Sequence, residues 1–232
     1  MKYPSMKFSL LLLLICFVFS IKAFSQLNGN YNYSLSLTGF SNFQNPKIFN
    51  QDPQRYVNSY ANGGMIKLND NQISYRLGGS FLQKNIDFQK DCANCDIANG
   101  KITDYTFKIG FEKNFSYSHI QPYFAFDLGY RYNRFKGVMN TITNQQVIDA
   151  TSAAEDTKTG MTASPILGIK INPTEQVTIF AESSLQFYYA HDRQETVTAN
   201  SPGITMINSF GKGDFLINPV TIGIQVHFGN KN

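Results

Sequence analysis

Period-two alternation of apolar and polar residues is the feature of this sequence that most constrains its fold. Successive side chains of a β-strand point to opposite faces, so such alternation predicts a strand with one apolar and one polar face. In VTIFAESSLQFYY, residues 177–189, the odd positions are apolar except for Ser183, and the even positions are mostly polar. TDYTFKIGFEK and IQPYFAFDLGYRYN repeat the pattern, and no stretch after Gln26 keeps the spacing of an amphipathic helix. An all-β protein is predicted.

Eight such strands are predicted, separated by connections of two lengths. The strands are expected at residues 30–41, 56–67, 72–88, 102–113, 119–136, 159–171, 177–190 and 214–228. Three connections, LNDN, NFSYSH and INPTEQ, are short and combine Asn with Asp, Ser or Pro, as tight turns require. The others are long and polar, and cover residues 42–55, 89–101, 137–158 and 191–213. Short and long connections alternate strictly along the chain.

This alternation of connection lengths indicates how the strands are arranged. If neighbouring strands pair as hairpins, every short turn lies at one end of the sheet and every long loop at the other, as in outer-membrane barrels. A sheet in hydrocarbon must also close on itself, because an unpaired peptide group there costs several kcal/mol. We therefore predict an eight-stranded antiparallel up-and-down transmembrane β-barrel, with both termini and the short turns on the periplasmic side.

A soluble, lipocalin-like barrel is the alternative, with the apolar face lining a ligand cavity and a charged face in water. Only 16% of the residues are charged, below the ~25% of an average soluble domain. The polar faces are chiefly Ser, Thr, Gln, Asn and Gly, and tyrosines gather toward the strand ends, where interfacial girdles are expected. These features favour the membrane barrel. Pro165 falls inside a predicted strand, so we expect a bulge or a rim position there.

The amino terminus is predicted to be a cleaved secretory signal. MKYPSMK carries two lysines, FSLLLLICFVFSI is a short apolar run, and Ala23 and Ser25 place small residues before Gln26. Residues 1–25 are thus expected to be removed and residues 26–232 to form one barrel domain. The signal takes three lysines with it and leaves 17 bases against 16 acids. Such an even balance gives no basis for nucleic acid as a partner.

The motif DCANCD has the CxxC spacing of redox and zinc sites. Redox activity needs a lowered thiol pKa, and flanking aspartates would raise it. Zinc needs four ligands, and no neighbouring histidine completes the set. In an oxidising compartment, a local disulfide between Cys92 and Cys95 is the expected state.

The polar strand faces carry charges that would lie in the lumen. Enclosed charges must be paired to offset desolvation, and an even balance favours a salt-bridged closed lumen over an ion-selective ring. We therefore expect no wide channel. Four bases and four acids are expected to face inward: Arg76, Lys108, Arg131, Lys170, Asp104, Glu112, Asp127 and Glu182.

Catalytic residues are not predicted, although some eight-stranded barrels of the outer membrane modify lipids. Such enzymes combine a histidine with a serine or aspartate. His119 falls in a short turn and His227 near the periplasmic end, which leaves His191, beside Asp192, as the candidate on the lipid-rich outer side. No serine could be placed beside it, and a noncatalytic protein with no metal site is expected.

The whole pattern resembles the small outer-membrane β-barrel proteins of Gram-negative bacteria, often labelled porin-family or outer-membrane-protein β-barrel domains and related to the transmembrane part of outer membrane protein A. The resemblance covers about residues 27–228 and rests on architecture and on hairpins such as GIKINPTEQVTIFAESSLQFYY. It implies insertion by the barrel assembly machinery into outer-membrane lipid, a structural, adhesive or surface-interaction role, and no cofactor.

The last strand, TIGIQVHF, is similar to the family's assembly signal at four positions: Thr221, Gly223, Val226 and Phe228. Its departure from the family is that GNKN follows Phe228. The functional hypothesis is a noncatalytic surface protein whose long loops, residues 137–158 and 191–213, engage an external ligand or partner. A small-solute or hydrophobic-ligand transport barrel is the alternative, and a lipid-modifying enzyme is the third possibility.

Overall fold

The computed structural model describes residues 31–49, 56–70, 73–89, 94–143, 146–147, 152–198 and 204–230. The predicted signal, residues 1–25, lies outside the described residues. The strands are β1 (Tyr31–Gln44), β2 (Tyr56–Asp70), β3 (Ile73–Gln89), β4 (Asn94–Asn114), β5 (Ile120–Thr143), β6 (Gln146–Val147), β7 (Ser152–Ile171), β8 (Val177–Thr198) and β9 (Thr205–Asn230). Within these residues there is no helix long and apolar enough to cross a membrane.

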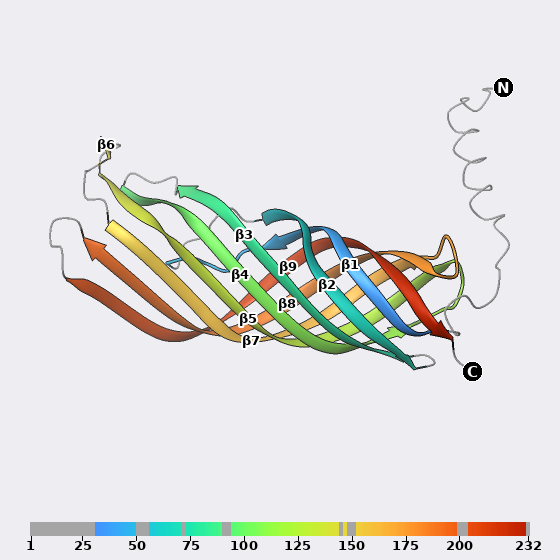
Figure 1. Cartoon of the computed structure of the whole chain (residues 1–232). Helices are drawn as coiled ribbons and strands as arrows, with labels where there is room; N and C mark the ends of the chain where they lie inside the picture. The colour runs from blue at the N-terminus through green and yellow to red at the C-terminus, as the bar shows by residue number, and fades with distance from the viewer. Residues whose placement is uncertain are drawn as a thin grey trace, which may run out of the picture.

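All strands except β6 close into one ring (Figure 1). The order around the ring is β1, β2, β3, β4, β5, β7, β8 and β9, every neighbouring pair is antiparallel, and β9 pairs back onto β1. The short β6 folds onto the end of β5 at Ile142 and Thr143. The predicted eight-stranded antiparallel up-and-down barrel is therefore confirmed.

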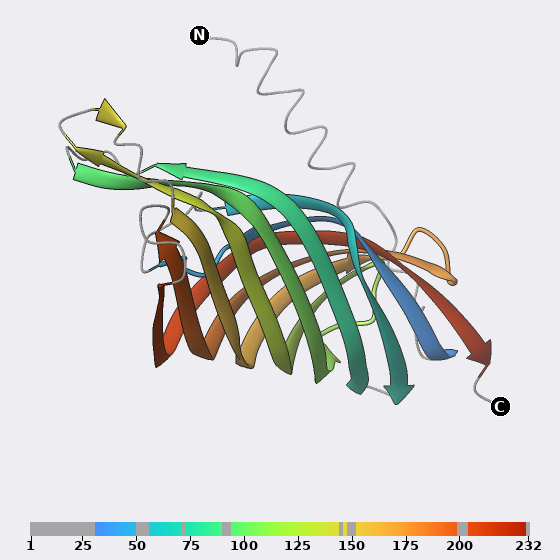
Figure 2. The same cartoon turned by 60° about the vertical axis from the view of Figure 1, so that its left-hand side comes forward.

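The strand ends that flank the three short connections lie at one end of the barrel, together with the start of β1 and the end of β9 (Figure 2). We call this the short-turn end. At the opposite end, β1 stops pairing with β9 at the Asn42–Val220 pair, and β2 stops pairing with β3 at the Gly63–Ser80 pair. The ring therefore closes only over the part of the barrel nearer the short turns.

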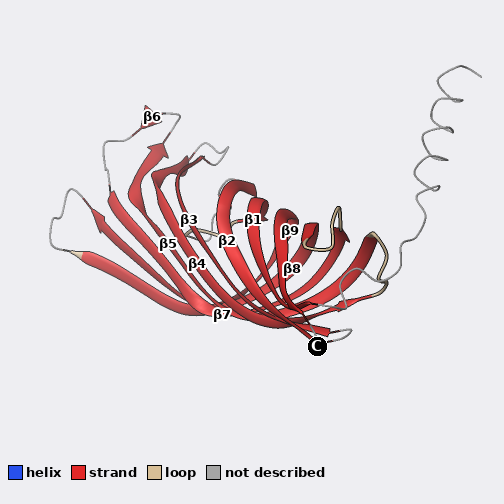
Figure 3. Cartoon of the chain, turned by 45° about the vertical axis from the view of Figure 1, so that its right-hand side comes forward, coloured by secondary structure: helices blue, strands red, loops and turns tan. Residues whose placement is uncertain are grey.

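Beyond that level, β3, β4, β5, β7, β8 and β9 continue as a curved sheet, which we call the wall (Figure 3). The expected long loops were wrong here, because most of residues 89–101, 137–158 and 191–213 belongs to these strands. Both faces of the wall mix polar and apolar side chains, so the apolar alternation that marks a strand is lost, while the backbone ladder continues.

The strand pairing is irregular in β1, where the inward and outward positions exchange, and in β7, where a proline lacks a backbone N–H. The β1–β2 and β1–β9 registers shift between Thr38 and Phe40, opposite Ala61, whose φ of 48° is left-handed. Pro165 is exposed on the outward face of β7 and causes no register shift. Instead, the β7–β8 ladder skips Ser164 and Pro165, because proline has no N–H to donate. The expected bulge at Pro165 is absent from β7.

Candidate functional site

The outward face of the barrel carries an apolar belt. Large apolar side chains there are 40% or more exposed. In water such a surface would promote aggregation, whereas in a bilayer it is the surface that faces the lipid hydrocarbon. These side chains include Leu35, Leu37, Ile66, Leu68, Leu77, Phe107, Ile109, Leu128, Leu167, Ile169, Leu185, Ile217, Ile222, Ile224 and Val226. Aromatic residues edge the belt at its wall side, where Phe81 stacks on Tyr105 with ring centroids 5.3 Å apart and Tyr132 lies tilted against Tyr105 at 5.6 Å.

The inward face is polar, and its centre is a buried ionic network around Glu112. Lys67 Nζ lies 2.6 Å from Glu112 Oε2, Arg76 Nη1 lies 3.3 Å from the same oxygen, and the Lys170 ammonium contacts Oε1. The side chain of Glu112 is 0% exposed. A carboxylate so enclosed depends on its three cationic partners, because an unpaired buried charge costs several kcal/mol.

Arg76 extends this network to two further acids. Its Nε lies 3.4 Å from Asp127 Oδ1, its Nη2 lies 3.0 Å from Glu182 Oε1, and the Tyr123 hydroxyl donates to Glu182 at 2.7 Å. We call the six charged residues Lys67, Arg76, Glu112, Asp127, Lys170 and Glu182 the Glu112 cluster. They come from six different strands, with three bases against three acids and side chains no more than 7% exposed. The cluster therefore links six of the eight ring strands across the interior of the barrel.

A polar layer lies between the Glu112 cluster and the short-turn end. His227 is 5% exposed, with Ser34 Oγ at 2.8 Å from Nδ1 and Thr178 Oγ1 at 2.7 Å from Nε2. Gln121 and Gln225 are 1% exposed or less at the same end. The interior on the side of the short turns is therefore occupied by buried, hydrogen-bonded side chains.

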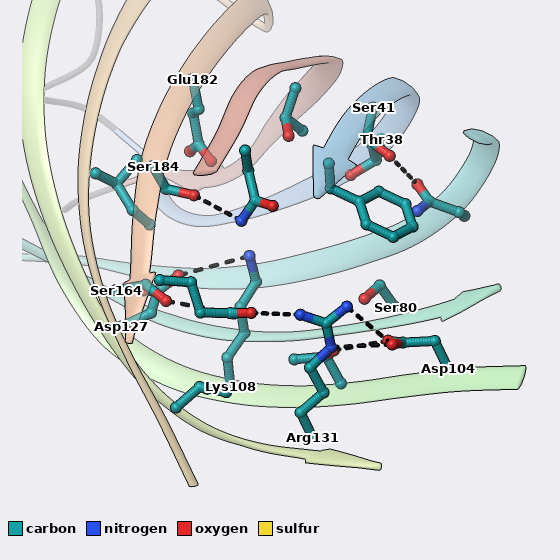
Figure 4. A pocket seen from close by; sticks show the side chains of 18 of the residues that line it. Thr38, Ser41, Ser80, Asp104, Lys108, Asp127, Arg131, Ser164, Glu182 and Ser184 are labelled. Carbon is teal, nitrogen blue, oxygen red and sulfur yellow. Dashed lines mark hydrogen bonds and ion pairs between the residues drawn. The ribbon is translucent and has the colours of Figure 1, made fainter. Parts of the chain in front are cut away.

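On the wall side of the cluster lies a polar cavity of about 110 Å³ (Figure 4). The Lys108 ammonium lies there 3.6 Å from Asp127 Oδ2, with 32% of its side chain exposed. Arg131 crosses the cavity, with Nη2 2.9 Å from Asp104 Oδ2 and Nη1 donating to Gln186 at 2.6 Å. The amides of Asn62 and Asn218 and the apolar side chains of Phe43, Leu82 and Ile166 also line it. Eight hydroxyls contribute as well, from Thr38, Ser41, Ser80, Thr106, Thr162, Ser164, Ser184 and Thr221. The cavity is large enough for several waters or a very small polar solute.

Further into the wall, the segment after β1 folds inward and packs against its concave face. Ile48 is 1% exposed and packs with Ile86, Ile102 and Phe135, together with Ala98 and the partly buried Phe49 and Met139. The backbone N–H of Phe49 donates to Asp156 Oδ2 at 2.6 Å. We call residues 45–49 the inner segment. It covers β3, β4 and β5 where the wall leaves the ring.

Comparisons with known proteins place this geometry among membrane barrels. No protein-family model and no curated protein matches the sequence. The fold is similar to the outer membrane protein OprG from Pseudomonas aeruginosa, with a TM-score of 0.55 and 8% identity over 88% of this chain and 100% of that one. It is also similar to a major outer membrane protein from Thermus thermophilus, with a TM-score of 0.50 and 10% identity over 84% of this chain and 99% of that one.

This chain has the fold of an eight-stranded outer-membrane β-barrel. At such low identities the likeness shows the fold alone. The exposed apolar belt and the ionic interior agree with it, because a soluble barrel has the opposite arrangement.

The barrel places all eight predicted lumen charges on its inner side, and seven of them are buried. Arg76, Asp127, Glu112, Lys170 and Glu182 meet in one network, whereas Arg131 and Asp104 form a separate pair and Lys108 reaches only Asp127. Four buried charges were missed: Lys67, Asp156, Lys158 and Asp192. Lys67 alternates with lipid-facing Ile66 and Leu68, a signal that could have found it, whereas the other three fall in segments expected to be loops.

The predicted assembly residues lie in β9, along its seam with β1. Phe228 pairs with Tyr33 and the rings stack with centroids 5.9 Å apart, while Val226 pairs with Leu35. Gly223 faces inward, and a Cβ there would lie 2.4 Å from the Phe180 ring. Thr221 lines the cavity. The terminal strand therefore closes the ring, and its role as an assembly signal stays a prediction.

The histidine candidate for catalysis has a serine beside it. Ser209 Oγ lies 2.7 Å from His191 Nε2 on the exposed outward face. Asp192 points to the opposite face, where it pairs with Lys158 at 3.0 Å. The pair therefore does not use its sequence neighbour as the orienting acid of a triad.

Of the two cysteines in the predicted disulfide, only Cys95 lies among the described residues, near the start of β4. Cys92 lies outside the described residues, and Cys95 is described only as backbone, where it pairs with Ile142 on β5. The disulfide stays a prediction. Among the described residues no three His, Cys, Asp or Glu side chains are grouped to hold a metal ion.

Proposed function

We propose that the protein is a noncatalytic integral protein of the outer membrane with a closed lumen, and that it acts at the cell surface through its wall. The short-turn end would face the periplasm and the wall the outside, as in other barrels of this fold. Outer-membrane lipid, the barrel assembly machinery during biogenesis, and an external ligand or surface partner are the proposed partners.

The Glu112 cluster is the observation that carries the closed lumen. Six strands each contribute one charged side chain to it, and Lys67 and Lys170 also lie 5.8 and 4.8 Å from the centroid of the Tyr123 ring. An ion crossing this layer would have to displace charges that are already paired. We therefore expect no large conductance.

The test is a planar-bilayer recording on purified, refolded protein. A barrel with a water-filled channel gives stable conductance steps, whereas this barrel should give none above the bare bilayer. The matched control replaces three bulky members of the cluster layer, Lys67, Glu112 and Tyr123, by serine, which should introduce leak. Large, stable steps from the unaltered protein would refute the closed lumen.

The wall is the surface proposed for interaction. In the wall, β4 and β5 extend more than ten residues beyond the aromatic edge of the belt. Their pairing continues from Tyr105–Tyr132 at that edge to Asn94–Thr143. Replacing the β8–β9 tip, residues 194–208, by a tight turn should abolish binding to a surface partner. The shortened protein should still show the heat-dependent gel shift of a folded barrel, which separates loss of interaction from loss of folding.

The polar cavity favours a second candidate function, passage of a small solute. Liposome swelling with small sugars and amino acids tests it. Swelling faster than in protein-free liposomes would favour transport over the closed lumen.

A further inference from the structure

The outward face of the wall carries a basic patch directly above the aromatic edge of the belt. The pairing registers place the residues in rows across β4 and β5. Tyr105 pairs with Tyr132 at the belt edge, Thr103 pairs with Arg134 in the next outward row, and Lys101 pairs with Lys136 in the row above that. Side chains on one face recur every second residue, so all three rows share the lipid-side face.

Height above the belt follows from strand geometry. Two residues advance a strand by about 6.7 Å, and a tilt of about 40° reduces this to roughly 5 Å along the membrane normal. Arg134 thus lies about 5 Å beyond the aromatic edge and Lys101 and Lys136 about 10 Å beyond it. A bilayer's polar layer is about 5 to 8 Å thick on each side of the hydrocarbon. Lysine side chains that reach back toward the membrane end within that layer.

The two lysines face each other without an acid between them. Like charges directly opposite on neighbouring strands are destabilising, and both residues are exposed. Within the described parts of the chain, neither ammonium has a carboxylate within ion-pair distance, whereas the nearby guanidiniums do. Arg134 Nε lies 2.7 Å from Glu155 Oε1, and Arg193 Nη2 lies 2.6 Å from Glu195 Oε1.

Glu155 is the cross-strand neighbour of Lys136 and interacts with it electrostatically, but its ion pair is with Arg134 and not with either lysine. Its Oε1 accepts the Arg134 hydrogen bond, and that bond holds the pKa of Glu155 below its ordinary value, so the carboxylate stays charged and committed to Arg134. The net charge of Lys101, Arg134, Lys136 and Glu155 is +2. An anion that approaches from the lipid side would relieve the repulsion between the lysines.

We propose that Lys101 and Lys136, flanked by Arg134, bind the phosphate of a lipid headgroup in the leaflet next to the wall. The site continues the apolar belt, so a lipid that packs its acyl chains on Phe107 and Tyr130 brings its headgroup to the lysines. In the orientation given under the proposed function, on which this inference rests, the lipid is the phosphorylated glycolipid of the outer leaflet. Each lysine near a charged membrane surface contributes about 1 kcal/mol, so the pair should strengthen binding by roughly 25- to 30-fold.

The test titrates purified, folded barrel in zwitterionic detergent with diphosphoryl lipid A, and in parallel with the same lipid after its phosphates are removed. Native mass spectrometry counts bound lipid. We expect the unaltered protein to retain the phosphorylated lipid, and Lys101→Gln with Lys136→Gln to need roughly 25-fold more lipid for equal occupancy. Lys113→Gln is the matched control, because Lys113 is exposed on the same face of β4 at the short-turn end.

Several outcomes are decisive. Equal retention of phosphorylated and dephosphorylated lipid, or equal affinity of the double variant and the Lys113 variant, overturns the proposal. Inorganic phosphate that competes at millimolar concentration would show a free-anion site instead of a lipid site and would also overturn it. The heat-dependent gel shift is recorded on each sample, so a protein that fails to form a barrel counts against the proposed function and not against the lipid site.

Discussion

Replacing Glu112 by glutamine should destabilise the barrel strongly, although the two side chains have nearly the same shape. Glu112 is 0% exposed and contacts Lys67 at 2.6 Å, Arg76 at 3.3 Å and Lys170. Glutamine leaves three bases in the cluster facing two acids, Asp127 and Glu182. Removing one member of a buried ion pair costs about 3 to 5 kcal/mol, because the remaining charge stays in a low-dielectric site.

The assay is urea unfolding of the barrel in phosphatidylcholine vesicles. The chain contains no tryptophan, so the folded fraction is best read from gel mobility without heating. Glu155→Gln is the control, since Glu155 also pairs with an arginine but is 29% exposed with its partner at 39%. Such an exposed pair contributes at most about 1 kcal/mol.

A double variant tests whether the loss of stability comes from the unbalanced charge of the cluster. Adding Lys67→Met to Glu112→Gln removes one uncompensated base and should recover part of the lost free energy of unfolding. The reasoning is refuted if Glu112→Gln lowers the free energy of unfolding by no more than Glu155→Gln does. It is also refuted if the losses from Glu112→Gln and Lys67→Met simply add in the double variant.

Three other perturbations test separate parts of the structure. Gly223→Val places side-chain atoms against the Phe180 ring, and should lower the free energy of unfolding by about 2 to 3 kcal/mol in the same urea assay; no change would contradict the inward register of β9. Burial raises the pKa of Asp156, which lies in the wall beyond the belt, from 3.8 to about 7; the Phe49 N–H and Lys158 oppose the rise, and Asp192 adds to it. The Phe49 N–H donates to this carboxylate and favours its charged form, so the anchoring of the inner segment through Phe49 should strengthen as Asp156 loses its proton between pH 5 and 8; hydrogen exchange at the Phe49 amide that quickens over that range, after correction for intrinsic rates, would contradict this. Phe228→Asp should stall insertion into the outer membrane while trimming residues 229–232 does little, measured by the gel shift of cell-envelope protein; normal insertion of the Phe228 variant would remove the assembly role.

The alternation in the sequence was sufficient to predict the ring, because each strand inside the belt has one face in lipid and one in the lumen. Residues 177–189 show this most clearly, with Leu185 and Phe187 outside and Gln186 and Tyr188 inside. The charges on these strands could be assigned to the lumen by parity alone. Their partners could not, since Lys67 and Glu112 are 45 residues apart on β2 and β4 and meet only through the registers that both strands adopt with β3.

The wall could not be predicted, because alternation carries no apolar contrast once both faces of a strand leave the hydrocarbon. Residues 191–198 read HDRQETVT, polar on both faces, yet they form the upper part of β8. The inner segment was missed for a different reason. Ile48 and Phe49 are two apolar residues within a mostly polar connection, and their partners Ile86 and Phe135 belong to distant strands. The bulge near Gly39 also shifts the parity of β1, which no periodicity could locate.

Isoleucine methyl signals test the central claim most directly, because the chain carries isoleucines on both faces of the barrel. Ile169 and Ile179 are each 42% exposed on the belt, and Ile224 is 54% exposed, whereas Ile166 is 3% exposed on the inner face of the same strand as Ile169. The measurement records these methyl signals from the folded protein in lipid nanodiscs, with and without a spin label attached to the acyl chains. A transmembrane barrel with a closed polar lumen predicts that Ile169, Ile179 and Ile224 are broadened and that Ile166 is spared. Broadening of Ile166 with Ile169 and Ile179 unaffected would mean that the barrel is turned the other way out, and would contradict the account.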